Sequence, residues 1–450
     1  AEALGELTHR DWIKTAEKVG TYIYPNQFKD YFDFAFILLH GPYGEDGSIQ
    51  GLFEWYNIPY SGCGLMSSAI GIDKHFQKQL QKITRPHDSI TKTLWLENDK
   101  KQIFEGLKSK VGLPLVIKAP YQGSSIGVSI LKEDSLEAFI AAVESCMFLQ
   151  KIKKEEWQIK DTVQKQDFIK NLIELDKGIG LPVVLTDESF LGGDLGEIVF
   201  YDPKQLIEKL DAFFEYADNE ITLSSFDSEE VILFESFIEG KEFSCGVIQD
   251  SEGNAVALPP TEISTSEHYD FDAKYTLGGS QKIIPIAVKN SDVERIREVC
   301  REHFEEYKYG VCARIDGFIT PKGDIFLIDT NTIPGMSPTS LIFRQAAEIG
   351  LSPTQLITYM IEMSLRERIK TGKQPYHLRF LLENLNHKLT TKILNQKQKA
   401  RKQIVIPSDW ENKNEELAKA RAIYTELNAK AEIIPEPVLQ VGDQLYSLPV

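Results

Sequence analysis

Two short apolar runs near residue 320 carry polar side chains at alternating positions, and this pattern limits the possible folds more than any other stretch. Residues 320–324 between the runs are rich in turn formers and predict a hairpin. Residues two apart on a strand point to the same face, so Asp329 and Asn331 lie together and Asp316 of the partner strand can join them. A plain buried strand would hold Val or Ile at these positions. The pattern therefore predicts a functional site on the hairpin, with a surface hairpin of solvated acids as the alternative.

The side chains on this face suit a metal ion and an anion. Asp316, Asp329 and Asn331 offer three hard oxygen ligands, which Mg²⁺ prefers together with substrate phosphates. Arg314 lies two residues before Asp316 and therefore shares its face. A guanidinium beside a metal site indicates phosphoryl or acyl-phosphate chemistry.

Composition excludes several other classes of protein. The 450 residues are 42% hydrophobic and 26% charged, as in soluble globular proteins. The formal net charge of −17 argues against a nucleic-acid-binding surface, which needs a basic footprint. No apolar run approaches the roughly 18–20 residues that span a bilayer, and the first residues lack a signal peptide, so we expect a cytoplasmic protein with no membrane partner. Reduced thiols are then expected at Cys63, Cys146, Cys245, Cys300 and Cys312.

The N-terminal part predicts a turn that faces a ligand. Tyr31–Leu39 has the pattern of a buried strand, residues 40–47 form a glycine-rich turn, and a helix follows from Ser48 to about Trp55. A strand, a glycine-rich turn and a helix N-terminus together place backbone N–H groups toward a ligand, although such turns are common. A second helix is expected from Ser67 to about Thr84, with Lys74 in its first half.

A glycine- and serine-rich loop at residues 123–127 lies between two expected strands, at residues 113–118 and 128–131. The first strand ends at Lys118. Two antiparallel strands joined in this way form a flexible flap that can cover phosphates. The loop is not a Walker A loop, because the G-x-x-x-x-G-K-[ST] pattern is absent and no helix follows directly. Taken alone, the stretch is also compatible with an ordinary hairpin.

A nucleotide-binding hinge is expected where the strand at residues 231–238 runs into a linker. The free N–H and C=O groups at such a strand end can read the edge of adenine, and Glu242 behind it can accept hydrogen bonds from ribose hydroxyls. Residues 269–275 contain the pair Lys274 and Tyr275 between two extended regions, which predicts a lid loop.

Two stretches carry no motif. Residues 150–229 have the pattern of an insertion, with a strand near residues 181–185 and a helix from Pro203 to about Tyr216. Beyond residue 369 we expect a basic helical run, a polar helix and a hairpin near residues 438–448. A structural or interaction role is the favoured interpretation of the insertion. The basic run is usually a solvated face rather than a site for an acidic partner.

The order of these motifs resembles that of the D-alanine–D-alanine ligases, in the ATP-grasp superfamily. The matching motifs, in chain order, are His40-Gly41-x-x-Gly44-Glu45-Asp46-Gly47, Ser68-Ala69-x-x-x-Asp73-Lys74, Lys118 with Gly123-Ser124-Ser125-x-Gly127, Gly240-x-Glu242-Phe243, Ala273-Lys274-Tyr275, Arg314-x-Asp316, and Asn331-Thr332-x-Pro334-Gly335-Met336 with Ser340. They span roughly residues 31–365, interrupted by the insertion. Several are specific, and their shared order argues against a chance match.

The resemblance implies an α/β (α+β) ATP-grasp fold. Part of a parallel-sheet N-terminal subdomain would precede it, and a helical C-terminal extension would follow. The expected divisions are a partial N-terminal substrate-binding subdomain (1–65), the first part of the ATP-grasp domain (66–149), the insertion (150–229), the catalytic part of the ATP-grasp domain (230–368) and the extension (369–450).

The resemblance also implies ATP-dependent ligation of two D-alanine molecules through an acyl phosphate, for peptidoglycan precursor synthesis. Two Mg²⁺ ions, with Mn²⁺ as an alternative, would bind at Asp316, Asp329 and Asn331. ATP would contact residues placed around its phosphates, base and ribose, namely Lys74, Lys118, Ser125, Glu235, Ser236, Phe237, Ile238, Glu242 and Lys274. The amino-acid substrates and the tetrahedral intermediate would meet His40, Ser124, Tyr275, Arg314, Gly335 and Ser340.

Individual roles follow from the same resemblance. Arg314 and the Gly335 N–H would form the oxyanion hole. Ser340 would hold the carboxylate of the second D-alanine. His40 would lie near the first D-alanine, although a histidine at this position could simply cap a turn.

Three departures from the family pattern leave alternatives open. The family begins with a strand, a glycine-rich loop and a helix carrying a glutamate, and no such segment is found before Tyr31. Asp329 stands where the family usually has a glutamate, and the insertion and the extension exceed the family pattern. A ligase with another acceptor, such as D-lactate, and a non-catalytic ATP-binding module are therefore alternatives, although Tyr275 favours an amine acceptor. A homodimer is a further expectation.

Overall fold

Helices and strands alternate along the chain, as expected of an α/β (α+β) protein. The strands of the described residues form four separate sheets. The computed structural model describes residues 15–80, 85–122, 126–175, 177–185, 198–216, 220–226, 228–263, 282–337, 339–372, 375–397, 400–407, 419–420, 422–424, 426–427, 430 and 433–447.

The first sheet is antiparallel, with the strand order β1-β8-β2-β3. It and its helices consist of β1 (His87–Thr91), α6 (Lys92–Glu97), α7 (Lys100–Lys110), β2 (Leu115–Lys118), β3 (Val128–Leu131), α8 (Leu136–Cys146) and β8 (Val231–Ser236). Rings from the helices and from β8 pack in its core, including Phe104, Phe139 and Phe234. Strand β2 is buried at every position, so Lys118 at its end emerges from a rigid support.

The second sheet has the order β12-β11-β9-β13-β14, with β10 paired to β9. Its elements are β9 (Lys241–Gln249), β10 (Ala255–Ala257), β11 (Thr261–Ile263), β12 (Lys282–Ile283), α13 (Asn290–Glu306), β13 (Cys312–Ile319), β14 (Ile325–Asn331), α14 (Leu341–Glu348) and α15 (Pro353–Thr371). The predicted hairpin is confirmed as β13 and β14, and the N–H of Thr320 donates to the Asp324 carbonyl at 2.9 Å to close it. Helix α13 packs its apolar face on this sheet through Ile296, Cys300 and Phe304.

The N-terminal part differs from the prediction at two places. Its elements are η1 (Pro25–Gln27), α2 (Phe28–Tyr31), α3 (Ser48–Tyr56), α4 (Leu65–Ile72) and α5 (Lys74–Leu80). The strand expected at Tyr31–Leu39 is wrong, because this stretch pairs with the described chain only through a parallel bridge between Ala35 and Tyr60. The single helix expected from Ser67 is also wrong. Asp73 has extended backbone (ψ 92°) and accepts from the N–H of Phe76 at 2.8 Å, which ends α4 and starts α5.

The stretch predicted as an insertion forms most of one hydrophobic core, to which Ala119 and Phe148 also contribute. Its elements are β4 (Leu149–Ile152), α9 (Lys154–Gln158), α10 (Thr162–Ile173), β5 (Val183–Leu185), β6 (Ile198–Phe200), α11 (Pro203–Tyr216) and β7 (Ile221–Ser225). The strands form an antiparallel sheet of order β4-β7-β5-β6, and Trp157, Phe213 and Phe214 pack against it. The predicted helix from Pro203 is confirmed, because Asp202 accepts from the N–H of Lys204 at 2.9 Å at its start.

The C-terminal extension is only partly helical. It contains α16 (Pro375–Lys397), β15 (Ala400–Pro407), β16 (Ile433–Val441) and β17 (Gln444–Ser447). The basic run therefore continues from α16 into β15, which pairs in parallel with β16. The hairpin predicted near residues 438–448 is confirmed as β16 and β17, and the polar helix expected between residues 411 and 431 lies largely outside the described residues.

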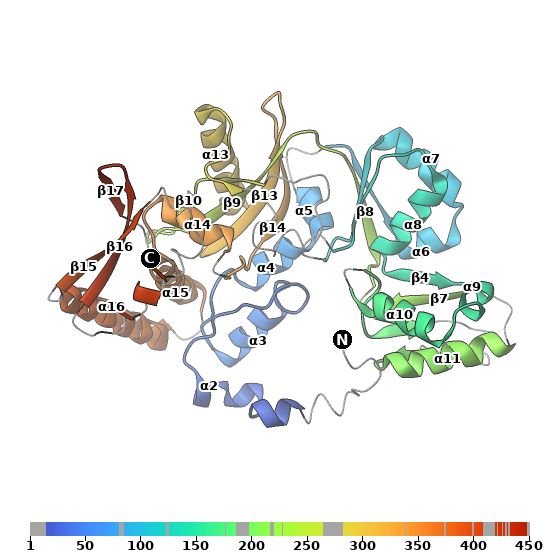
Figure 1. Cartoon of the computed structure of the whole chain (residues 1–450), viewed down its shortest axis with the longest axis horizontal. Helices are drawn as coiled ribbons and strands as arrows, with labels where there is room; N and C mark the ends of the chain where they lie inside the picture. Colours follow the sequence, from blue (N-terminus) through green and yellow to red (C-terminus); the bar gives the residue numbers. More distant parts are fainter. Residues whose placement is uncertain are drawn as a thin grey trace.

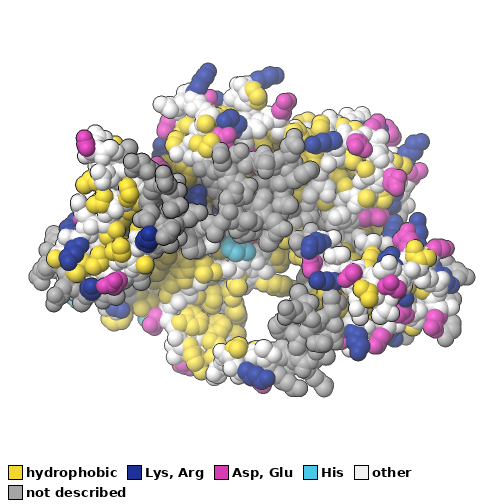
Figure 2. All heavy atoms as spheres, viewed as in Figure 1, with side chains coloured by type: hydrophobic (Ala, Val, Ile, Leu, Met, Phe, Trp, Pro, Cys, Tyr) yellow, Lys and Arg dark blue, Asp and Glu magenta, His cyan; other side chains and the backbone are white. Residues whose placement is uncertain are grey.

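The second sheet lies at the centre of the molecule (Figure 1). The first sheet and the insertion lie on one side of it, the extension lies on the other, and α4 and α5 run alongside β14. Figure 2 shows apolar side chains gathered over α3 and toward α2. None of the described helices is long and apolar enough to cross a membrane.

Candidate active site

The hairpin brings the four predicted polar residues onto two adjacent strands. In the β13–β14 ladder Arg314 is opposite Asn331 and Asp316 is opposite Asp329. A bulge follows Asp316, where the register shifts at Gly317. A bulge twists the strand locally and changes the direction of side chains near it. The predicted grouping of these residues on one hairpin is therefore what the structure shows.

Asp316 is the most connected member of the group. It accepts from Ser244 Oγ at 2.6 Å, from Arg314 Nη2 at 3.0 Å and from Asn331 Nδ2 at 3.3 Å. Arg314 Nε lies 3.2 and 3.3 Å from the two carboxylate oxygens. Burial alone lowers the pKa of Arg314, but Asp316, with Asp329 and Glu45, raises it above its usual range. The guanidinium therefore stays charged and is held in one orientation.

The donor set fits a hard divalent cation. Two carboxylates and a side-chain amide face one another, which are the oxygen ligands that Mg²⁺ takes together with phosphates. Among the residues that the structure describes, no group of three or more His, Cys, Asp or Glu side chains could hold a metal ion.

Lys74 lies beside the carboxylate end of the hairpin. Its Nζ is 3.3 Å from Asp329 Oδ1 and donates to the carbonyl of Gln122 at 2.7 Å. The lysine is nearly buried, at the start of α5, and the loop predicted to cover phosphates begins directly after Gln122. Lys74 therefore contacts both a predicted metal ligand and the residue that precedes this loop.

Glu235 was expected at an adenine-reading hinge, but its side chain is a buried counter-ion. It is fully buried, and Oε2 accepts from Arg85 and lies 2.8 Å from Lys118 Nζ. Lys78 Nζ is 3.1 Å from Oε1. Burial alone raises the pKa of Glu235, but Lys118, Lys78 and Arg85 hold it well below its usual value. The expectation missed this role because Lys78 and Arg85 lie about 150 residues earlier in the sequence.

The backbone of the hinge is partly engaged. The N–H of Ser236 donates to the Pro86 carbonyl at 3.0 Å, and its carbonyl accepts from Arg85 at 2.7 Å. The N–H of Phe237 donates to the Pro114 carbonyl at 3.2 Å. Ile238, which is buried, follows directly, and Glu242 is in β9, opposite Phe318 of β13. The hinge therefore connects the first sheet to the second at the edge of the hairpin.

His40 and Glu45 lie near each other in the glycine-rich turn that precedes α3. His40 is half-exposed, and its Nδ1 is 4.0 Å from Glu45 Oε1. Glu45 is buried and accepts from the N–H of Gly41 at 2.8 Å, which holds the glycine-rich turn in shape. Glu45 also contributes to the raised pKa of Arg314, so the turn and the hairpin interact electrostatically.

Gly335 and Ser340 face each other after the hairpin. A Cβ at position 335 would lie 3.2 Å from Ser340 Oγ, so a larger residue would crowd this contact. Ser340 Oγ is 3.0 Å from Ser337 Oγ, and Ser340 is the N-cap residue of α14. The close contact between Gly335 and Ser340 keeps the Gly335 backbone near the start of α14. The remaining predicted residues lie outside the described ones, namely Ser124, Ser125, Lys274 and Tyr275.

Several contributors were not predicted from the sequence. Gln345 of α14 is fully buried and donates to the Ser244 carbonyl and to Thr261 Oγ1, both at 2.8 Å. It therefore fixes the strand whose Ser244 hydroxyl orients Asp316. Lys78, which contacts Glu235, was not predicted either. The sequence does hold a local signal for it, because Lys78 follows Lys74 by one helical turn and shares its face.

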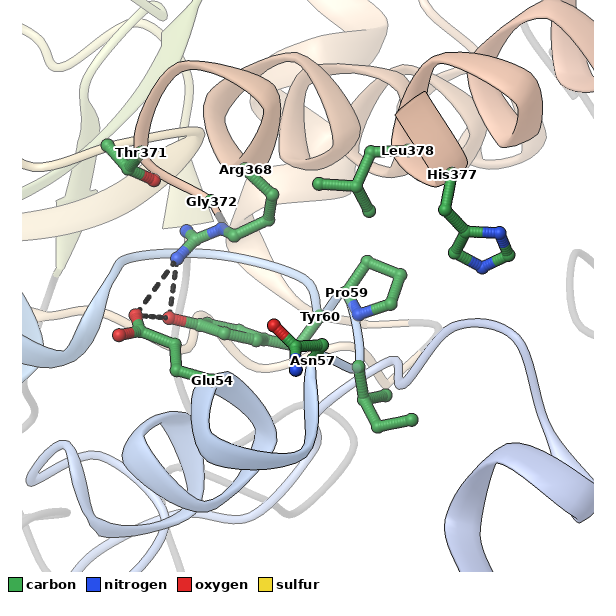
Figure 3. Close-up of a pocket in the computed structure, with 10 residues that line it drawn as sticks. Glu54, Asn57, Pro59, Tyr60, Arg368, Thr371, Gly372, His377 and Leu378 are labelled. Atoms are coloured by element: carbon green, nitrogen blue, oxygen red, sulfur yellow. Dashed lines mark hydrogen bonds and ion pairs between the residues drawn. The ribbon is translucent and has the colours of Figure 1, made fainter. Parts of the chain in front are cut away.

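A small pocket lies at the junction of α3, α15 and α16 (Figure 3). Arg368 of α15 donates to the Tyr60 hydroxyl and to the Gly62 carbonyl at 2.9 Å, and its guanidinium lies 4.1 Å from the Tyr60 ring centre. Glu54 accepts from the Tyr60 hydroxyl at 2.7 Å. A Cβ at Gly62 would lie 3.4 Å from the carbonyl of Thr332, one residue beyond Asn331. Arg368 thereby holds the loop around Gly62 near the hairpin.

Comparison with known proteins identifies the family. The family models described as D-ala D-ala ligase N-terminus and C-terminus match residues 8–63 and 206–362. The D-alanine–D-alanine ligase of Carboxydothermus hydrogenoformans is 30% identical over 351 residues, covering 76% of this chain and 84% of the relative. The chain belongs to the D-alanine–D-alanine ligase family. The ligase of Pelotomaculum thermopropionicum is 28% identical over 364 residues, covering 80% of this chain and 88% of that ligase.

Solved structures of D-alanine–D-alanine ligases are more distant in sequence. The ligase of Bacillus anthracis complexed with ATP has a TM-score of 0.45 and 23% identity, covering 78% of this chain and 86% of that one. The ligase of Coxiella burnetii has a TM-score of 0.48 and 18% identity, covering 80% and 73%. The family assignment rests on the sequence matches, and the chain is an enzyme of the ligase class with the ATP-grasp fold. The expectation drawn from the motifs is confirmed at this level.

Proposed function

We propose that this D-alanine–D-alanine ligase family member joins two D-alanine molecules in an ATP-dependent reaction. The carboxylate of one D-alanine attacks the γ-phosphorus of ATP, which gives D-alanyl phosphate and ADP. The amine of the second D-alanine then attacks the acyl carbon, and inorganic phosphate leaves as the peptide bond forms. The product, D-alanyl-D-alanine, serves as a peptidoglycan precursor.

The observation that carries this proposal is the grouping of Arg314, Asp316, Asp329, Asn331 and Lys74. Two cations and two carboxylates within hydrogen-bond or ion-pair distance of one another suit a triphosphate bound through a divalent metal. Phosphoryl transfer needs positioning and charge neutralisation more than covalent participation by the protein. The preset orientation of these side chains is what such a reaction requires.

ATP would be bound along the line from the hinge to the hairpin. Lys74 and Lys118 would hold the α and β phosphates, with Lys274 on the γ phosphate and the Ser125 loop above them. The backbone of Ser236 to Ile238 would meet adenine, and Glu242 the ribose. Glu235 supports Lys118 from behind, because its carboxylate is held by Lys118, Lys78 and Arg85.

We assign Asp316, Asp329 and Asn331 to two Mg²⁺ ions, which Mn²⁺ can replace. Such ions neutralise charge on the phosphates when ATP is bound. Arg314 and the Gly335 N–H would stabilise the oxyanion of the tetrahedral intermediate, and Ser340 would bind the carboxylate of the second D-alanine. His40 would lie by the first D-alanine, and Ser124 and Tyr275 would orient the substrates under the lid.

A direct assay tests the proposal. Purified protein is incubated with ATP, Mg²⁺ and D-alanine, and ADP and D-alanyl-D-alanine are followed by coupled absorbance and mass spectrometry. We expect one ADP and one phosphate for each dipeptide. Dipeptide formed equally well from L-alanine would contradict the stereochemistry. If no dipeptide forms but ATP stabilises the protein against heat, the non-catalytic ATP-binding module is favoured. If a D-lactate ester forms in preference to the dipeptide, D-lactate is favoured as the acceptor.

Three wider assignments belong to the same proposal. We place the enzyme in the cytoplasm, where ATP is available. We propose domain boundaries at residues 65, 149, 229 and 368, supported by a hydrophobic core that lies largely within the insertion. We propose a homodimer, supported by large exposed apolar side chains such as Leu39 and Trp55 in the part that contains α3, and sedimentation velocity tests it.

A further inference from the structure

The carboxylate of Glu235 is shared by cations from three different segments. Lys78 comes from α5, Arg85 precedes β1, and Lys118 ends β2. All four side chains are at least nine-tenths buried. Each carboxylate oxygen of Glu235 therefore has at least one cation within ion-pair distance. A buried carboxylate is costly unless cations neutralise it.

Lys78 divides its contacts between the two sheets. Its Nζ lies 3.1 Å from Glu235 Oε1 in the first sheet and donates at 3.1 Å to the Leu327 carbonyl in β14. Arg85 and Lys118 both contact Oε2. In the part of the chain that the structure describes, Lys78 is the cation within ion-pair distance of Oε1. Lys78 therefore neutralises charge at Oε1 of Glu235 and connects β8 to the β13–β14 hairpin.

We propose that Lys78 is a positioning residue for ATP that acts through Glu235 and Lys118. This inference rests on the proposed function, in which Lys118 binds phosphate. With Lys78 present, Glu235 is neutralised from two sides and the charge of Lys118 remains available to the nucleotide. Without Lys78, Oε1 loses its counter-ion, and Glu235 binds Lys118 more tightly as a closed ion pair. The affinity for ATP falls, while the groups that meet D-alanine are untouched.

The experiment measures binding of a non-hydrolysable ATP analogue with Mg²⁺ by calorimetry, together with steady-state kinetics. Lys78→Met keeps the apolar stem and removes the charge, and we expect the Kd of the analogue and the KM for ATP to rise on the order of tenfold. The KM for D-alanine stays within about twofold. Lys78→Arg keeps the charge and restores most of the affinity. The matched control is Lys108→Met, which removes a lysine of α7 that pairs with Glu105 and Asp134. It changes neither the Kd of the analogue nor the KM for ATP.

A double variant keeps the inference testable if Lys78→Met is unstable. In Lys78→Met/Glu235→Gln the carboxylate charge is gone, so Lys118 is released and ATP affinity recovers part of its loss. A double variant that binds no better than Lys78→Met contradicts the inference, as does Lys78→Met with wild-type affinity. A wild-type protein that does not bind the analogue refutes the proposed function itself, which separates the two failures.

Discussion

At the scale of single residues, Arg314 connects the most parts of the site. Its guanidinium reaches both oxygens of Asp316 at 3.0–3.3 Å, while Glu45 and Asp329 act on it electrostatically. A cation oriented before substrate binds needs little reorganisation when charge develops on the substrate. This geometry makes Arg314 the residue whose removal is most informative.

Arg314→Ala is expected to lower kcat by about 10²–10³, because an oxyanion donor is lost. Binding of the ATP analogue should persist, since Lys74 and Lys118 are unchanged. Steady-state kinetics and calorimetry measure the two effects, with Arg301→Ala on the exposed face of α13 as the control. Unchanged turnover would remove Arg314 from the mechanism.

At the scale of elements, α13 supports β14 through a buried histidine. His303 Nε2 lies 3.0 Å from Thr330 Oγ1, between the predicted metal ligands Asp329 and Asn331 in the sequence. Burial lowers the pKa of His303 to about 4, although Glu306 opposes this. The neutral ring is therefore part of the packing behind the hairpin.

Acid is expected to destabilise the fold through His303. Below pH of about 6.5 the unfolded chain binds a proton that the native ring does not, so the free energy of unfolding falls until pH approaches 4. The loss amounts to about 2–3 kcal/mol. Urea unfolding at pH 7 and 4.5 should show a smaller loss in His303→Gln than in the wild type. Burial raises the pKa of Glu229 to about 7, so protonation of Glu229 stabilises the native state as the pH falls. This effect is the same in the wild type and in His303→Gln, and it cancels when their losses are compared. Equal losses would show that His303 does not carry the effect.

Helix α15 contacts the N-terminal part of the chain through the buried side chain of Arg368. Arg368→Ala removes the hydrogen bonds to Tyr60 and Gly62 and the contact with the Tyr60 ring, so we expect a loss of about 2–4 kcal/mol in unfolding free energy. Arg366→Ala, two residues earlier on the same helix, removes only a half-exposed pair with Glu362 and should cost below about 1 kcal/mol. Chemical denaturation compares the two, and equal losses would contradict the role given to Arg368.

The sequence predicted elements where the signal is local. The alternation around Asp316 and Asp329 is contained in one hairpin, and Asp202-Pro203 contains the start signal of α11, so both were found. The role of Glu235 was missed because its partners arrive from α5 and from the segment before β1. The single long helix expected from Ser67 was wrong because the side chain of Asp73 caps a new helix there.

At the scale of the whole molecule, the site lies where separately packed parts meet. The first sheet supplies Lys118 and Glu235, the second supplies the hairpin, and the N-terminal part supplies His40 and Lys74. The motifs of these parts lie far apart in the sequence, and their meeting at one site stays a prediction, supported by the ion pair between Lys74 and Asp329. The insertion and the sheet of the extension carried no motif, and their packing follows from long-range strand pairing that no local pattern encodes.

In the proposed reaction these parts together activate a carboxylate as an acyl phosphate. The most direct measurement uses D-alanine labelled with ¹⁸O in its carboxylate, with ATP and Mg²⁺, and analyses the released phosphate by ³¹P NMR and mass spectrometry. We predict one ¹⁸O atom in each phosphate for each dipeptide formed, because the oxygen that attacks ATP leaves with the phosphate. Unlabelled phosphate, or release of AMP and pyrophosphate, would contradict activation of the carboxylate as an acyl phosphate.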